Sequence, residues 1–154
     1  MHPNRKAFLD MVAWAELGPR LLAISDNGYN VNVGSTPERP ILFRSYASHP
    51  MFRIRDAKIN SDAAGRYQCM GRYWPHYQMV LKLPDFGPAS QDKWALHLIK
   101  ECKALDDVDA GRIADAIHKC RSRWASFPKA GYGQPEKKLE DLLKAYQRAG
   151  GELA

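Results

Sequence analysis

Apolar side chains recur at the spacing of an α-helix in several short stretches of this chain, and that periodicity limits the fold more than any other feature. In the first stretch, residues 3–17, the apolar residues share one face and Gly18 is a natural end. The members of that face are Phe8, Met11, Val12 and Ala15. Because every such stretch is short, the sequence predicts several short helices rather than a long coiled coil.

Other segments complete the prediction of a mainly α, α+β fold. Further helices are expected at residues 65–72 after the cap candidates Ser61 and Asp62, at 77–83 after Pro75, after caps at Ser90 and Asp109, and from Pro135 to the terminator Gly150-Gly151. Alternating residues 29–33 predict a strand, with a turn at 34–40 and a returning strand at 41–46. Residues 48–60 have no clear period, which predicts an exposed loop.

Size and charge narrow the class of protein. A chain of 154 residues fits one domain of ordinary size. The formal charge of +6 indicates an anionic partner, but does not choose between nucleic acid, a membrane surface and a cell-wall polymer. No apolar run approaches the roughly 20 residues that span a bilayer. The polar N-terminus lacks a signal peptide, so we expect a cytosolic protein without a membrane span.

Metal and cofactor chemistry find little support in the sequence. The three cysteines, Cys69, Cys102 and Cys120, lack CxxC spacing and are interpreted as reduced core or boundary thiols. The five histidines are dispersed, so no metal site is expected. No Walker loop, dinucleotide fingerprint, GxSxG elbow or HExxH motif occurs, and no cofactor is expected.

Glu16 is an acidic residue on an apolar helix face. At about 100° per residue it projects within roughly 20° of Leu9. Desolvation there would raise the pKa of the carboxyl, and a carboxyl that holds its proton near neutral pH can act as a general acid. On the pattern alone, a glutamate that frays into water at the last turn is the simpler explanation. Periodicity alone therefore makes Glu16 a candidate only.

Most glycosidases pair such an acid with a second carboxylate. The next acid along the chain, Asp26, precedes Asn27-Gly28, where an aspartate is expected in a turn for local reasons. The sequence therefore shows no obvious catalytic partner for Glu16.

Aromatic residues gather with polar ones in two segments, around Tyr67 and in the glycine-rich loop at residues 130–134, which contains Tyr132. Rings stack on sugar faces while amides and guanidinium groups bind hydroxyls, so this mixture suits a saccharide. It also suits single-stranded nucleic acid, and core packing explains some of the rings. His49, in a polar loop before Pro50, is kept as a binding candidate.

Five blocks of the sequence together resemble the lambda-type endolysins, in order and in spacing. They are KAFLDMVAWAE (6–16), GYNVNVG (28–34), AGRYQ (64–68), DFGPASQD (85–92) and WASFPKAGYGQ (124–134). The resemblance implies a lysozyme-like fold with a small β-hairpin beside the catalytic helix. It also implies that residues 1–154 form a single catalytic domain without a separate wall-binding domain.

The activity implied by the resemblance is that of a peptidoglycan lytic transglycosylase, which cleaves the bond between N-acetylmuramic acid and N-acetylglucosamine and leaves a 1,6-anhydro end. Glu16 matches the family's catalytic acid. An attacking hydroxyl within the same sugar would explain the missing second carboxylate. The substrate contacts implied by similarity, with His49 added from its loop position, are Tyr29, Asn30, His49, Arg66, Tyr67, Gln68, Tyr132 and Gln134.

The resemblance also implies a biological setting. A phage or prophage enzyme of this type is a monomer that accumulates in the host cytoplasm, reaches periplasmic peptidoglycan after a holin acts, and binds no nucleic acid. Asn27 stands where the family has a histidine, which bears on substrate range. A hydrolytic muramidase that uses Asp26 as a base, and a basic binding protein without catalysis, remain alternatives.

Overall fold

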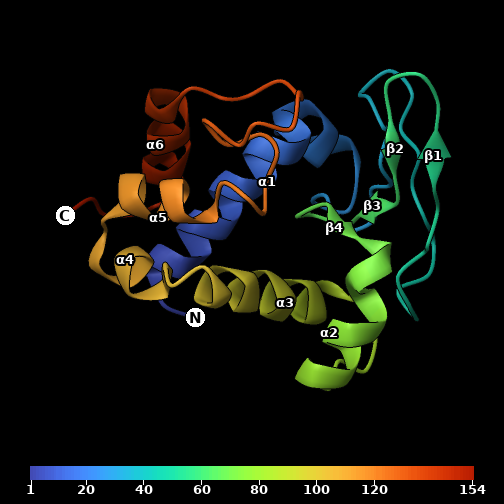
Figure 1. Cartoon of the computed structure of the whole chain (residues 1–154), viewed down its shortest axis with the longest axis horizontal. Coiled ribbons are helices and arrows are strands. Elements are labelled where there is room, and N and C mark those ends of the chain that lie inside the picture. The colour runs from blue at the N-terminus through green and yellow to red at the C-terminus, as the bar shows by residue number, and fades with distance from the viewer. The chain divides into compact units, whose positions relative to one another are not determined.

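Helices make up most of the regular structure, which confirms the mainly α, α+β prediction. The computed structural model describes all 154 residues (Figure 1). Its elements, in chain order, are α1 (Pro3–Ile24), β1 (Ile54–Arg55), β2 (Asn60–Ser61), β3 (Ala63–Ala64), β4 (Cys69–Met70), a 3₁₀ turn (Gly71–Tyr73), α2 (Trp74–Leu81), α3 (Pro88–Glu101), α4 (Leu105–Ala110), α5 (Ile113–Cys120) and α6 (Leu139–Arg148). None of the helices has the length and apolar character needed to cross a membrane.

Gly18 interrupts α1 where the sequence predicted its end. Its φ of 78° and ψ of 159° are not helical, and a positive φ of this size favours glycine. Helical structure resumes at Pro19 and continues to Ile24, which was not predicted. Proline suits this restart because it has no N–H to leave unpaired and its φ is already close to the helical value.

The chain forms two compact units, and α1 and α3 each contribute to both. The first unit contains residues 1–16 and 95–154, and the second contains residues 17–94. In the first, Phe8 is fully buried and packs edge-on against Phe127, with ring centroids 6.4 Å apart. The apolar face predicted for the first helix is therefore the core face of this unit.

Three predicted helix starts in the sequence are wrong. Ser90 lies within α3, where its hydroxyl donates a hydrogen bond to Asp85. Asp109 lies within α4, an unpredicted helix, and binds the guanidinium of Arg5 at 2.7 Å. Pro135 precedes α6, which begins only at Leu139. Each of these residue types is common at the start of a helix. Here side-chain contacts or an extended backbone place the start of each helix at another residue.

The helix predicted at residues 65–72 is also wrong, because this segment forms a hairpin. Strands β3 and β4 are antiparallel, with Ala64 opposite Cys69, and residues 65–68 make the turn. Gly65 and Gln68 both have positive φ, 83° and 50°, which no α-helix allows. A Cβ on Gly65 would also clash with the amide of Gln91. The Asp62 carboxylate accepts the Gly71 N–H instead of capping a helix.

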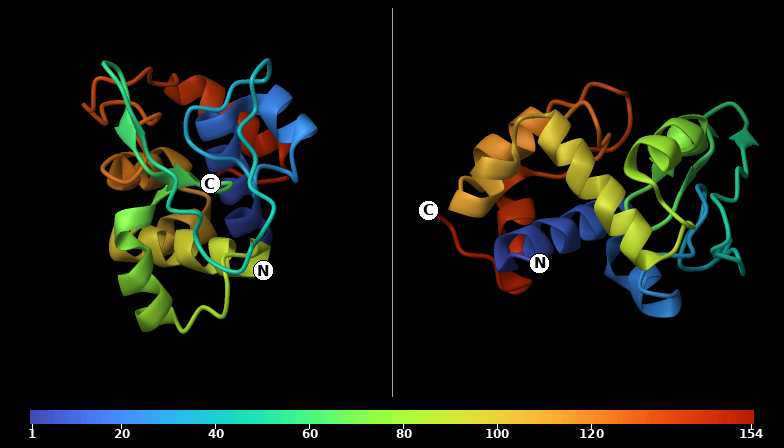
Figure 2. Two further views of the ribbon diagram at one scale, coloured as in Figure 1. Left: turned by 90° about the vertical axis from the view of Figure 1, so that its right-hand side faces the viewer. Right: turned by 90° about the horizontal axis from the view of Figure 1, so that it is seen from below.

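The strands predicted at residues 29–33 and 41–46 do pair, but only through an isolated antiparallel bridge between Val31 and Leu42. A second bridge joins Asn32 to Ala64, so the segment has partners on both sides. Residues 48–60 are mostly exposed, as predicted, yet their end forms the short hairpin of β1 with β2. The turn of this hairpin lies on the side away from α2 (Figures 1 and 2).

Candidate active site

Glu16 is the last residue of α1 that belongs to the first unit, and it is partly buried. Burial removes water from the carboxyl and raises its pKa from 4.5 to about 8. The hydroxyl of Ser126 and the positive charge of Lys137 act in the opposite direction but are outweighed. Glu16 therefore carries a proton at neutral pH, which is the state a general acid needs.

Ser126 is the neighbour of Glu16 that the sequence did not single out. It is 7% exposed, and its hydroxyl makes no hydrogen bond of ordinary geometry. The hydroxyl nevertheless lies near enough to the carboxyl of Glu16 to favour the charged form. A buried donor beside an acid can stabilise that acid after it has given up its proton.

Lys137 joins this group from the segment before α6. Its backbone N–H donates to the carbonyl of Ser126 at 2.7 Å, which brings the two segments together. Its ammonium lies 5.6 Å from the ring centroid of Trp14, two residues before Glu16 in α1. The guanidinium of Arg148 lies 5.9 Å from the same ring. The positive charge of Lys137 therefore favours the ionised carboxylate of Glu16, although burial outweighs this effect.

Tyr132 and Gln134 belong to the same unit as Glu16 and are exposed. The phenol of Tyr132 is held in place, because its hydroxyl donates to the Ser122 carbonyl at 2.6 Å. The loop itself is closed by the Glu136 carboxylate, which accepts the N–H groups of Lys129 and Gly131. A fixed, 56% exposed ring is a suitable surface for a sugar face.

Two predicted binding tyrosines of the second unit share one partner that the sequence analysis missed. The hydroxyls of Tyr29 and Tyr67 both donate to the same oxygen of Asp92, at 2.9 and 2.6 Å. Burial raises the pKa of both phenols, that of Tyr29 to about 12, so both stay protonated donors. In the sequence, Asp92 stood out only as the last residue of the block DFGPASQD that resembles the endolysins.

Arg66 is buried, with 5% of its surface exposed. Its guanidinium donates to the Asn27 carbonyl at 2.9 Å and to the Tyr67 hydroxyl at 3.1 Å. It also lies over the rings of Tyr29 and Tyr67, 5.4 and 5.5 Å from their centroids. These contacts give Arg66 a role in holding the two tyrosines in place.

Gln68 and Asn30 are partly exposed, and each supports the backbone nearby. The Gln68 amide donates to the carbonyls of Val31 and Gly65, at 3.2 and 2.8 Å. The Asn30 amide oxygen accepts the N–H of Asp26 at 2.9 Å. The side chain of Asp26 in turn accepts a hydrogen bond from the Tyr46 hydroxyl.

His49 does not lie in an exposed polar loop, so that expectation is wrong. It is 3% exposed and packs against Phe86, with ring centroids 4.8 Å apart. One ring nitrogen accepts the Met51 N–H and the other donates to the Cys69 carbonyl, both at 3.0 Å. Burial lowers the pKa of the imidazole, which favours its neutral form. The aromatic neighbours are distant in sequence, so local polarity could not reveal this burial.

The hydrogen bond from Tyr67 to Asp92 allows a direct test of the tyrosine arrangement. Tyr67→Phe should lower the free energy of unfolding by about 1 to 3 kcal/mol, because the partly buried carboxylate of Asp92 loses a charge-assisted hydrogen bond from a buried phenol. Tyr132→Phe removes a hydroxyl from an exposed ring and should cost about 0.5 kcal/mol or less. Urea denaturation of both variants measures the difference, and equal losses would contradict the buried arrangement.

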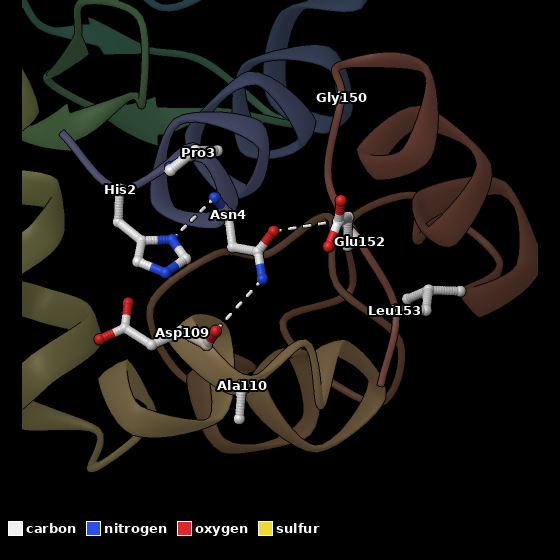
Figure 3. A pocket seen from close by; sticks show the side chains of 8 residues that line it. All are labelled: His2, Pro3, Asn4, Asp109, Ala110, Gly150, Glu152 and Leu153. Carbon is white, nitrogen blue, oxygen red and sulfur yellow. Dashed lines mark hydrogen bonds between the residues drawn. The ribbon is translucent and has the colours of Figure 1, made fainter.

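A pocket of about 390 Å³ lies elsewhere in the first unit, and none of the predicted site residues lines it (Figure 3). Asn4 crosses it, donating to the Asp109 carbonyl at 3.2 Å and accepting the Glu152 N–H at 3.1 Å. Asn4 thereby joins α1 to α4 and to the segment after α6. No cluster of three His, Cys, Asp or Glu residues suited to a metal ion occurs in the structure.

Comparisons with known proteins agree with the sequence resemblance. The family model described as Endolysin matches residues 6–153. The endolysin of Escherichia phage P2 is 46% identical over 97% of this chain and 94% of its own length, and that of Escherichia phage lambda is 44% identical over 96% and 92%.

Solved structures match equally well. Bacteriophage lambda lysozyme in complex with a chitohexasaccharide has a TM-score of 0.91 and 42% identity, covering 100% of this chain and 98% of its own. A second structure of the lambda lysozyme has a TM-score of 0.86 and 40% identity, with the same coverage. These matches confirm the lysozyme-like fold, and the chain belongs to the endolysin family of bacteriophages.

Proposed function

We propose that this endolysin is a peptidoglycan lytic transglycosylase in which Glu16 acts first as an acid and then as a base. Endolysins and lysozymes are enzymes that cleave peptidoglycan, and the chain is related to both along almost its whole length. The observation that carries the proposal is the carboxyl of Glu16, whose pKa burial raises to about 8. A group that is protonated at neutral pH can donate to a glycosidic oxygen.

The proposed reaction begins with proton transfer from Glu16 to the oxygen between N-acetylmuramic acid and N-acetylglucosamine. The bond to C1 breaks, and the acetamido group of the substrate helps to stabilise the positive charge. Glu16, now a carboxylate, removes the proton from the C6 hydroxyl, and that oxygen attacks C1 of the same sugar. The product is a 1,6-anhydro ring, and Glu16 ends the cycle protonated.

The neighbours of Glu16 support its change of charge. While the carboxyl is neutral, burial keeps its proton in place. Once it is ionised, the Ser126 hydroxyl and the Lys137 ammonium favour the negative charge. Burial thus favours the neutral acid, and Ser126 and Lys137 favour the carboxylate. The same side chain can therefore donate a proton in the first step and accept one in the second, and no water is needed as the base.

The saccharide contacts are proposed according to exposure. We assign direct contact to the exposed or partly exposed residues Tyr29, Asn30, Gln68, Tyr132 and Gln134. Arg66, Tyr67 and His49 are buried, so we assign them to positioning those contacts rather than to the sugar itself. The complex of lambda lysozyme with a chitohexasaccharide supports an oligosaccharide as the ligand class.

The wider setting is proposed from the family. We propose that the chain acts as a monomer and as one catalytic domain. We also propose that it accumulates in the cytoplasm of the host and reaches periplasmic peptidoglycan after a holin opens the membrane. Its charge of +6 would attract it to the anionic wall, and salt would weaken this attraction.

The mass of the reaction products tests the proposed chemistry directly. Purified peptidoglycan digested with the enzyme should yield muropeptides lighter by one water than the products of hydrolysis, because the C6 hydroxyl replaces water as the nucleophile. Mass spectrometry after complete digestion distinguishes the two. Products with only reducing ends would overturn the transglycosylase and favour a hydrolytic muramidase.

A further inference from the structure

Two of the free cysteines are neighbours in the first unit. Cys102 directly follows α3, and Cys120 is the last residue of α5. The residues next to Cys102 in sequence, Glu101 and Lys103, contact Arg123 and Lys119, which lie on either side of Cys120 in sequence. The Cys120 thiol acts on the Cys102 sulfur as a nearby hydrogen-bond donor does. The third cysteine, Cys69, lies in the other unit, where its backbone carbonyl binds His49.

Contacts on both sides of the thiols hold the ends of α3 and α5 together. Before the first cysteine, the Glu101 carboxylate accepts a hydrogen bond from the Arg123 guanidinium at 3.2 Å. After it, the Lys103 carbonyl accepts one from the ammonium of Lys119 at 3.4 Å. Cys102 and Cys120 therefore lie on two segments that are joined by contacts on both sides of Cys102.

The two thiols differ in access and in acidity. Cys102 is partly exposed, whereas Cys120 is 0% exposed. The hydrogen bond from Cys120 lowers the pKa of the Cys102 thiol, and Arg123 lowers it further, against the effect of burial. The same hydrogen bond and burial raise the pKa of Cys120. An accessible thiol of low pKa beside a buried one is typical of thiol exchange, where the first attacks and the second resolves.

We propose that Cys102 and Cys120 form a thiol–disulfide exchange site that reacts with an external disulfide, either a small molecule or a protein. The Cys102 thiolate attacks one sulfur of that disulfide and releases its other half as a thiolate. Cys120 then loses its proton and attacks the sulfur of Cys102, forming the internal disulfide and releasing the second half. Two electrons and two protons pass to the external disulfide, which leaves as two thiols.

The reaction would join the end of α3 covalently to the end of α5. It does not involve Glu16, so this proposal stands or falls independently of the transglycosylase mechanism. It differs from the expectation from sequence that all three cysteines are reduced core or boundary thiols. That expectation rested on spacing along the chain, which does not show that Cys102 and Cys120 meet.

The test uses the reduced, folded, full-length protein treated with oxidised glutathione at neutral pH. Intact-mass spectrometry should show the loss of two hydrogens without a lasting glutathione adduct, and reductant should reverse the change. Cys69→Ser should behave in the same way, because it leaves the pair intact. A wild-type protein that stays reduced, or that keeps a glutathione adduct, would overturn the proposal.

Two single variants separate the roles of the thiols. Cys120→Ser should accumulate a glutathione adduct on Cys102, since no second thiol resolves it. Cys102→Ser should react at least about tenfold more slowly than the wild type, because the remaining thiol of the pair is buried. A Cys102→Ser variant that reacts as fast as the wild type would contradict the assignment. The intact-mass measurement on the wild type needs no substitution, so it tests the exchange reaction even if a variant fails to fold.

Discussion

Glu16→Gln should reduce the rate of peptidoglycan cleavage by about 10²- to 10⁴-fold, the contribution typical of a general acid or base. Glutamine keeps the size of the side chain but can neither give a proton to the glycosidic oxygen nor take one from the C6 hydroxyl. Release of soluble muropeptides from purified wall measures the rate. Clearing of chloroform-treated Gram-negative cells provides a second measurement.

The matched control is Glu140→Gln, which makes the same chemical change at an exposed residue in the first turn of α6. It should leave the rate within about twofold, because exposed substitutions away from a site have small effects. Full activity of Glu16→Gln would remove Glu16 from the mechanism. If the wild type and Glu16→Gln bind peptidoglycan equally well and neither cleaves it, the chain is a binding protein without catalytic activity.

The hydrolytic alternative is tested by Asp26→Asn. The Asp26 side chain is exposed and accepts the Tyr46 hydroxyl, so we assign it to the turn and expect little loss of activity. A loss as large as that of Glu16→Gln would make Asp26 a second catalytic carboxylate. That result would favour a muramidase, in which one carboxyl protonates the leaving group and another activates water.

The second large effect expected is that Glu16→Gln stabilises the folded protein at neutral and alkaline pH. The folded state holds the proton of Glu16 up to about pH 8, whereas 4.5 is the ordinary pKa of the carboxyl. Between these values the folded state binds more protons than the unfolded state, so the free energy of unfolding falls as pH rises. Below pH 4.5 this contribution is fully present, and above pH 8 it is lost.

Glutamine does not ionise, so the variant escapes this loss. Each pKa unit corresponds to about 1.4 kcal/mol. Because water still reaches part of the side chain, we expect the variant to exceed the wild type by roughly 1 to 3 kcal/mol at pH 8, and by nothing at pH 4. Urea denaturation followed by tryptophan fluorescence across this range measures the difference. A difference that does not change with pH would contradict a raised pKa.

Ser126→Ala refines the same experiment. Removing the hydroxyl takes away a group that favours the charged form of Glu16, so the pKa of Glu16 should rise further. The pH at which stability falls should move upward with it, and so should the alkaline limit of activity. A variant that loses stability equally at every pH would show that the hydroxyl serves packing alone.

Periodicity in the sequence located Glu16 correctly on a helix that breaks at Gly18, because helix geometry is local and a positive φ restricts the residue that adopts it. It could not show how strongly burial shifts the pKa of the carboxyl. That shift depends on Ser126 and Lys137, which lie more than a hundred residues further along the chain.

The sequence by itself determined the fold class, the position of Glu16 and membership of the endolysin family, since helical spacing and family blocks are written along the chain. Only the tertiary structure decided which polar candidates are buried, and it buried His49, Arg66 and Tyr67. It also turned the AGRYQ segment into a hairpin and brought Cys102 to Cys120. The physical reason is that burial and pairing depend on contacts between distant segments, which no local pattern of residues encodes.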